Sequence, residues 1–253
     1  MAGIDASASL PTVLFLPGLL CDASVFADQR AALAGRMQTA VADFSRHDDL
    51  TSMAHAALAL CDGPLTVIGH SMGGRVAMEI WRIAPWRVQR LCLMDTGTYP
   101  RRDGEEAQRQ ILVDLAFTQG MAALADRWLP PMVHQERVGD CTLMAPLREM
   151  VMRATPELHA RQIRALLNRP DARPLLATIR CPTLVMVGRQ DRWSPLAQHV
   201  EIAGAIAGAE LVIIEDSGHM IPVEQPEQVT QALLHWLGLA ESPAAVAVTV
   251  RLG

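Results

Sequence analysis

The sequence lacks the segments that mark membrane-spanning and secreted proteins. None of its windows reaches about 18 uninterrupted apolar residues, the length that a membrane-spanning helix requires. The first residues, MAGIDASASLPTV, contain neither a basic start nor a long apolar core, so they do not resemble a signal peptide. These absences predict a cytoplasmic protein with no membrane partner.

The sequence also lacks a large excess of positive or negative charge. Its formal net charge is -5 at pH 7, and the charged residues, which make up 19% of the chain, are not gathered in runs. This balance argues against a nucleic-acid partner and favours a neutral or weakly charged one. Hydrophobic residues account for 50% of the chain, which is enough for a large buried core and excludes a disordered or fibrous protein.

Residues that form disulfides or bind metals follow no recognisable pattern. The five cysteines are odd in number and scattered, so we expect small core residues in a reducing compartment. They are Cys21, Cys61, Cys92, Cys141 and Cys181. Six histidines are isolated, without metal-ligand spacing: His47, His55, His134, His159, His199 and His235. The sequence therefore predicts no metal and no cofactor.

Short apolar strands alternate with helical stretches along most of the chain. This alternation indicates a parallel sheet with right-handed crossovers. We expect an α/β fold in which about six strands, all parallel, are flanked by helices. The expected strands are Thr12–Leu16, 37–44, 65–68, Val88–Met94, 183–187 and 211–216, and the expected helices are 22–35, 50–61, 72–84, 195–207 and 226–237.

The alternation is interrupted between residues 98 and 177, where only helical stretches are found. We interpret 98–177 as a helical cap inserted into a core formed by residues 1–97 and 178–238, with a tail at 239–253. Five methionines in the cap are candidates for a pocket lining, although packing between the helices is the simpler role: Met121, Met132, Met144, Met150 and Met152. The apolar tail either pairs with a sheet edge or stays disordered.

The stretch LTVIGHSMGGRVAMEIW, residues 65–81, has the pattern of a nucleophile elbow. Gly69, Ser71 and Gly73 satisfy Gly-x-Ser-x-Gly between an apolar strand and a helix. A serine on so sharp a turn requires neighbours without a Cβ atom close to it. The N-terminus of the following helix favours negative charge beside the serine hydroxyl.

An acid and a histidine follow this serine in the chain order that the elbow predicts. Asp191 comes directly after one expected strand and His219 directly after the last, so both should reach the same sheet edge as Ser71. A neutral imidazole can accept the serine proton while a carboxylate orients the ring. Asp95 ends a strand at the same edge and is the alternative acid, with a structural or pocket-lining role the simpler interpretation.

Two further residues near this edge have simpler roles than catalysis. His70 precedes the serine, and its side chain should point away from Ser71, which favours packing or hydrogen bonding. Asp22 could contact a loop near the reacting atoms, but capping a helix is the simpler explanation.

The chain resembles the α/β-hydrolase superfamily over nearly its whole length. The resemblance is carried by LFLPGLLCD, GHSMGG, LMDTG, VMVGRQDRWSP and EDSGHMIPVEQPE, in family order and spacing. It implies Ser71 as nucleophile, His219 as general base, Asp191 as acid, and an oxyanion hole from the backbone N–H groups of Met72 and Leu19. The chain departs from the family in having Pro17-Gly18 where His-Gly is usual, in the loop that carries Leu19.

These features predict a cofactor-free serine hydrolase that cleaves a small to medium carboxylic ester or lactone through an acyl-enzyme. Within the superfamily, the elbow and the short cap resemble carboxylesterases and 3-oxoadipate enol-lactonase-like members. A carbon–carbon bond hydrolase or a thioesterase is the alternative within the fold. A ligand-sensing protein with slow turnover is the alternative from another class.

Overall fold

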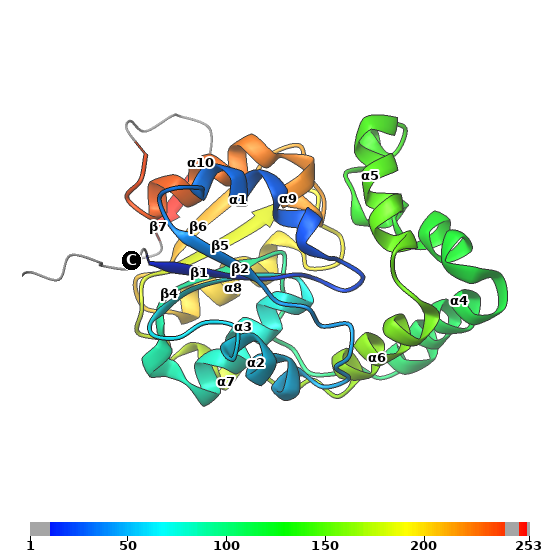
Figure 1. The fold of residues 1–253 in the computed structure, drawn as a ribbon, viewed down its shortest axis with the longest axis horizontal. Helices are drawn as coiled ribbons and strands as arrows, with labels where there is room; N and C mark the ends of the chain where they lie inside the picture. The colour runs from blue at the N-terminus through cyan, green and yellow to red at the C-terminus, as the bar shows by residue number, and fades with distance from the viewer. Residues whose placement is uncertain (1–10, 241–247, 252–253) are drawn as a thin grey trace, which may run out of the picture.

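The computed structural model describes residues 11–240 and 248–251, which build one sheet flanked by helices (Figure 1). Seven strands follow the spatial order β2-β1-β3-β4-β5-β6-β7. The first six pair in parallel, which confirms the predicted six-stranded parallel sheet. They are β1 (Thr12–Leu16), β2 (Gln38–Val41), β3 (Leu65–His70), β4 (Val88–Met94), β5 (Thr183–Gly188) and β6 (Glu210–Ile214).

The expectation that every strand is parallel is wrong at one edge. The tail contributes β7 (Val248–Arg251), which pairs antiparallel with β6. A strand at a sheet edge presents unpaired backbone N–H and C=O groups, and a β-prone segment such as VTVR can pair with them. Of the two alternatives for the tail, edge pairing holds for these four residues. The rest of the tail beyond residue 240 lies outside the described residues.

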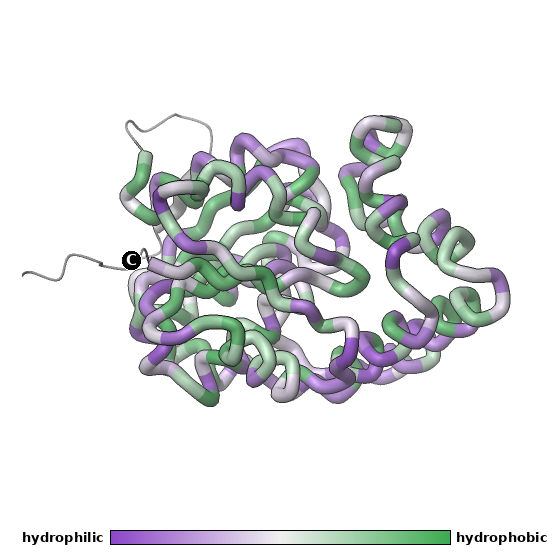
Figure 2. Tube along the Cα trace, in the orientation of Figure 1, coloured by the Kyte–Doolittle hydropathy of each residue, from purple (hydrophilic) through white to green (hydrophobic). Residues whose placement is uncertain are grey.

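The central strands form the core because helices cover both faces of the sheet. β3 and β5 are buried along their whole length, as expected of continuous apolar runs in a parallel sheet. Figure 2 shows hydrophobic residues along the strands and hydrophilic residues on the outer turns of the helices. The helices of this part are α1 (Ala27–Leu33), α2 (Leu50–Leu58), α3 (Met72–Ile83), α8 (Leu196–Ala205), α9 (Ile221–Glu224) and α10 (Pro226–Trp236), with 3-10 turns at Ala23–Phe26 and Pro85–Arg87.

The two faces of the sheet carry different helices. α1 packs against α10 on one face, while α2 packs against α3 on the other (Figure 1).

The expected helix 22–35 begins as a 3-10 turn whose cap is Asp22, because the Asp22 carboxylate accepts a hydrogen bond from the Ser24 N–H at 2.9 Å. This confirms the capping role expected of Asp22. No helix of the described residues is long and apolar enough to cross a membrane.

Helices alone fill the chain between β4 and β5. They are α4 (Glu105–Trp128), α5 (Cys141–Met152), α6 (Pro156–Leu167) and α7 (Arg173–Leu176), with 3-10 turns at Pro130–Met132 and Gln135–Arg137. α4 packs against α5 and α6, and these three helices, here named the cap helices, lie beside the sheet (Figure 1). α4 is kinked at Gly120, whose φ of 83° is outside the helical range. The division into core, cap and tail stays a prediction.

Candidate active site

Ser71 lies on a sharp turn between β3 and α3. Its φ of 55° and ψ of -114° are strained for a residue with a side chain. The backbone packs so closely here that a Cβ atom on Gly69 would come within 2.4 Å of the Gly73 carbonyl oxygen. A Cβ atom on Gly73 would lie 1.9 Å from the carbonyl oxygen of Leu16. The two elbow glycines are therefore required by the close approach of backbone on both sides of Ser71.

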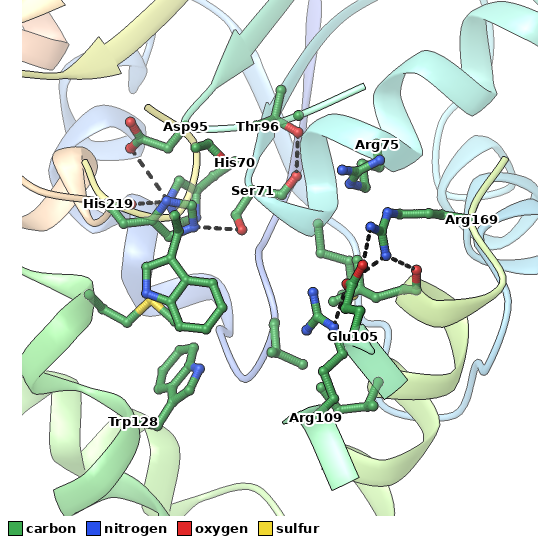
Figure 3. A pocket seen from close by; sticks show the side chains of 18 of the residues that line it. His70, Ser71, Arg75, Asp95, Thr96, Glu105, Arg109, Trp128, Arg169 and His219 are labelled. Atoms are coloured by element: carbon green, nitrogen blue, oxygen red, sulfur yellow. Dashed lines mark hydrogen bonds and ion pairs between the residues drawn. The ribbon is translucent and has the colours of Figure 1, made fainter. Parts of the chain in front are cut away.

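Hydrogen bonds to neighbouring strands hold this strained turn in place. The Ser71 N–H donates to the Met94 carbonyl oxygen at 2.8 Å, and the Thr96 hydroxyl donates to the Ser71 carbonyl oxygen at 2.7 Å. The Thr96 N–H in turn donates to Nε2 of the buried His199 at 2.9 Å. Both backbone polar groups of Ser71 are thus paired, and its hydroxyl points into the site (Figure 3).

A chain of two hydrogen bonds joins Ser71, His219 and Asp191. Nδ1 of His219 lies 2.8 Å from Oδ2 of Asp191, and Nε2 lies 2.8 Å from the Ser71 Oγ atom. An ionised carboxylate can only accept, so Nδ1 carries the ring proton and donates it. Nε2 is then free to accept the hydrogen bond from the serine hydroxyl. The structure therefore brings the three residues together as the sequence predicts.

Asp191 is kept ionised by its donors. Burial raises the pKa of its carboxyl, but the charge and hydrogen bond of His219 and the N–H of Ser194 outweigh burial and hold this pKa below its ordinary value. Its second oxygen accepts hydrogen bonds from the N–H groups of Trp193 at 2.7 Å and Ser194 at 3.0 Å. This carboxylate is thus fixed in position and negative where it meets the imidazole.

Asp95, the alternative acid, contacts a different histidine. It is fully buried, accepts a hydrogen bond from the Gly188 N–H at 3.0 Å, and lies 3.7 Å from Nε2 of His70. Burial and the negative charge of Asp191 raise the pKa of its carboxyl well above the ordinary value. His70 Nε2 donates to the His219 carbonyl oxygen at 2.7 Å, which confirms the hydrogen-bonding role expected of His70. These residues support the His219 loop from beneath.

Glu224 supports the same loop, and the sequence analysis did not identify it. Its carboxylate accepts from the N–H groups of Gly218 at 2.9 Å, Met220 at 3.1 Å and His134 at 2.7 Å. Burial raises the pKa of this carboxyl. The two loop donors flank His219, so Glu224 fixes the backbone on both sides of the imidazole.

The two residues whose backbone N–H groups the resemblance implies as oxyanion donors lie beside Ser71. Leu19 and Met72 both line the cavity around Ser71. Met72 opens α3, so its N–H has no partner within the helix. The adjacent Leu20 has a φ of 60° and donates its N–H to Oε1 of Gln162 in α6 at 2.8 Å. A cap helix therefore holds the loop that carries Leu19, the loop in which the chain departs from the family pattern.

The cavity above Ser71 measures about 430 Å³ and lies between the sheet edge and the cap helices. Its walls include the aromatic side chains of Trp128 and Trp193. Of the five cap methionines considered as lining, only Met132 lines this cavity. Figure 3 shows a second, polar wall on the opposite side of Ser71 from His219, formed by Arg75, Glu105, Arg109 and Arg169. The sequence analysis did not identify these four residues.

No three His, Cys, Asp or Glu side chains of the described residues are grouped so that they could hold a metal ion. The groups that the structure brings together at this edge are the Ser71 hydroxyl, the His219 imidazole and the Asp191 carboxylate. Such a set can form a covalent intermediate on serine and stabilise an oxyanion.

Comparison with known proteins places this geometry in a family. A family model described as "Alpha/beta hydrolase family" matches residues 13–232. The thermophilic esterase from Thermogutta terrifontis, solved with malate bound, is similar in structure, with a TM-score of 0.83 and 28% identity over 91% of this chain and 90% of that one. The enol-lactonase from Burkholderia xenovorans LB400 shares the fold, with a TM-score of 0.81 and 24% identity over 92% and 94%.

A curated relative has a different named activity. The 2-hydroxy-6-oxononadienedioate/2-hydroxy-6-oxononatrienedioate hydrolase of Escherichia coli O81 (strain ED1a) is 28% identical over 188 residues, which is 69% of this chain. The match covers 62% of that relative, so this chain spans less than two thirds of its length.

Proposed function

The chain belongs to the alpha/beta hydrolase family, and from this premise we propose that it is a serine hydrolase of carboxylic esters or lactones. The substrate is a small to medium ester or lactone, held between the sheet edge and the cap helices. Ser71 is the nucleophile, His219 the general base and Asp191 the acid that orients the imidazole. The cytoplasm as location stays a prediction from the composition.

In the first half of the reaction, Ser71 Oγ attacks the carbonyl carbon of the substrate while Nε2 of His219 takes the hydroxyl proton. The carbonyl oxygen becomes an oxyanion, which the N–H groups of Met72 and Leu19 stabilise. Asp191 stabilises the imidazolium that forms. The imidazolium then donates its proton to the departing alcohol oxygen, and the acyl group stays on Ser71.

In the second half, water replaces the alcohol. Nε2 of His219 takes a proton from the water, whose oxygen attacks the acyl carbon and forms a second tetrahedral intermediate. Collapse of this intermediate returns the proton to Ser71 Oγ and releases the carboxylic acid. A lactone follows the same steps, with its ring oxygen as the leaving group.

One observation carries the proposal: the two hydrogen bonds of 2.8 Å that join the strained Ser71 to Asp191 through His219. Nucleophile and base within hydrogen-bond reach, with the base oriented by a third group, is the arrangement required for acyl transfer. The esterase from Thermogutta terrifontis, at 28% identity over 91% of this chain, gives further support.

Turnover of a p-nitrophenyl ester series tests the proposal, with the Ser71→Ala variant as the reference. We expect wild-type kcat/KM to exceed that of Ser71→Ala by at least about 10³-fold, since loss of the nucleophile removes the covalent route. Equal turnover by the two proteins would refute the enzyme proposal and favour the ligand-sensing alternative. Mass spectrometry of the quenched reaction should also find the acyl group on Ser71.

Cleavage of a carbon–carbon bond is the second candidate, because the relative from Escherichia coli O81 is named for a dienedioate substrate. Its test is direct turnover of 2-hydroxy-6-oxononadienedioate beside the ester series. A kcat/KM for the dienedioate well above that for every ester would favour this candidate.

A further inference from the structure

One cation of the polar wall, Arg75, has no carboxylate partner. Arg75 lies on α3 four residues after Ser71 and lines the cavity. Its guanidinium donates one hydrogen bond, from Nη1 to the Tyr99 carbonyl oxygen at 3.1 Å, and no carboxylate of the described residues pairs with it. Its remaining N–H groups therefore have capacity for a ligand, since a guanidinium carries five donors.

The neighbouring arginines differ from Arg75 because they pair with a carboxylate, that of Glu105. Arg169 donates to both oxygens of Glu105, at 2.8 and 2.6 Å, and to the carbonyl oxygens of Tyr99 and Pro100. Arg109 donates to Glu105 Oε1 at 2.7 Å. Two arginines thus share one carboxylate and serve to fix the 99–105 segment, and the wall keeps an excess of positive charge around Arg75.

A buried histidine in α6 adds a second unpartnered group. His159 is 0% exposed and lines the same cavity, and neither ring nitrogen has a hydrogen-bond partner among the described residues. Burial and the positive charge of Arg109 lower the pKa of its imidazole to about 4, so the ring is neutral and offers one donor and one acceptor. A buried polar side chain without partners is costly unless a ligand or water pairs with it.

From these contacts we propose that Arg75 and His159 form a subsite for a free carboxylate of the substrate. The proposal rests on the proposed ester or lactone hydrolysis and narrows its substrate class to acidic esters or lactones. Arg75 is half-buried, and a cation partly removed from water attracts an anion more strongly than the same cation in water does, because the surrounding dielectric constant is lower. A planar guanidinium also matches the two oxygens of a carboxylate.

The start of α3 brings the two ends of such a substrate close together. Ser71 is the N-cap of α3 and Arg75 lies in the first turn of this helix, so both residues lie at the same helix end, where both line the cavity. The free carboxylate should therefore be a few bonds away from the scissile carbonyl, as in a half ester of a short dicarboxylic acid. Arg75 also stays protonated at neutral pH, although burial and the charges of Arg169 and Arg109 lower the pKa of its guanidinium to about 9.

The test compares monomethyl glutarate with methyl pentanoate, a neutral ester of equal chain length, by titrating the acid released. We expect wild type to prefer the half ester by about 10- to 100-fold in kcat/KM, the range for hydrogen bonds to charged groups. In Arg75→Gln this ratio should fall to about 1, and Arg75→Lys should retain part of it. Arg164→Gln removes the same charge from an exposed position of α6 and should leave the ratio unchanged.

A second measurement covers the case in which Arg75→Gln does not fold. Glutarate should inhibit wild-type hydrolysis of p-nitrophenyl acetate competitively, and glutaramide, its neutral analogue, should not. Equal turnover of the two methyl esters together with no inhibition by glutarate would overturn the carboxylate subsite while leaving ester hydrolysis intact. If no ester is turned over faster than by Ser71→Ala, the proposed function fails instead. Glutarate binding to Ser71→Ala, measured by calorimetry, then still decides the subsite.

Discussion

Exchanging Asp191 for asparagine tests the proposed mechanism most directly, because both oxygens of this carboxylate have defined hydrogen-bond partners. One carboxylate oxygen accepts from the Trp193 and Ser194 N–H groups, and the other accepts from Nδ1 of His219 at 2.8 Å. An asparagine keeps its oxygen toward the two backbone donors, so its NH₂ group faces His219. Nδ1 must then accept, the ring proton moves to Nε2, and the imidazole can no longer accept the Ser71 proton.

The wrong tautomer of a catalytic histidine typically costs about 10³- to 10⁴-fold in rate, or about 4 to 5 kcal/mol in the activation free energy. We expect a loss of this size in the kcat/KM of Asp191→Asn for p-nitrophenyl acetate, with little change in the melting temperature. Asp95→Asn is the matched control. Burial already raises the pKa of the Asp95 carboxyl, so a neutral amide is a close substitute there.

Stopped assays of both variants beside wild type decide between the two acids. Asp95→Asn should keep kcat/KM within about tenfold of wild type, because its oxygen still accepts from the Gly188 N–H. If Asp191→Asn stayed within tenfold while Asp95→Asn lost a thousandfold, the assignment of the acid would be wrong.

Two further predictions follow from contacts of the cap helices and from buried histidines. Gln162→Leu leaves the buried Leu20 N–H without its acceptor, and we expect kcat for p-nitrophenyl acetate to fall about 10-fold, while Gln162→Glu, which keeps an acceptor, should lose less. Thermal unfolding should shift to lower temperature as pH falls below 6.5, since burial lowers the folded-state pKa of the histidines below their unfolded value and only the unfolded state binds the protons. Between pH 6.5 and pH 5 each of these histidines lowers the free energy of unfolding by up to about 2 kcal/mol. An unchanged melting temperature over this range would contradict the prediction. These histidines are His70, with a pKa of about 3, and His159 and His199, each with a pKa of about 4.

The sequence predicts the parallel sheet and the three residues Ser71, Asp191 and His219 for one physical reason. Each of them lies in the turn or loop that follows a strand, and parallel strands bring their carboxyl ends to one edge of a sheet. Local patterns that mark strand ends therefore also place side chains that are more than a hundred residues apart. The structure finds all three at this edge, although their catalytic roles stay predictions.

Residues whose function depends on a distant partner escape the same reasoning. Gln162 contacts Leu20 and Glu224 contacts His134, pairs that no periodic pattern connects. The chain-wide net charge of -5 also says nothing of the local excess of arginine in the cavity. One signal was available for Arg75: it lies four residues after the predicted nucleophile, in the first turn of the helix that follows the elbow.

α6 contacts both halves of the proposed site, and this links substrate binding to catalysis. His159 and Gln162 are three residues apart on this helix, a spacing that puts both on one side of it. Gln162 holds the loop that carries Leu19 through the Leu20 N–H, while His159 lines the cavity that contains the proposed carboxylate subsite. In this proposal, a carboxylate that pairs with His159 and Arg75 fixes α6 against α3 and, through Gln162, fixes the loop of the proposed oxyanion donor Leu19. Substrates that lack the carboxylate should consequently lose kcat as well as affinity, because the cap helix that they fail to contact also positions the loop.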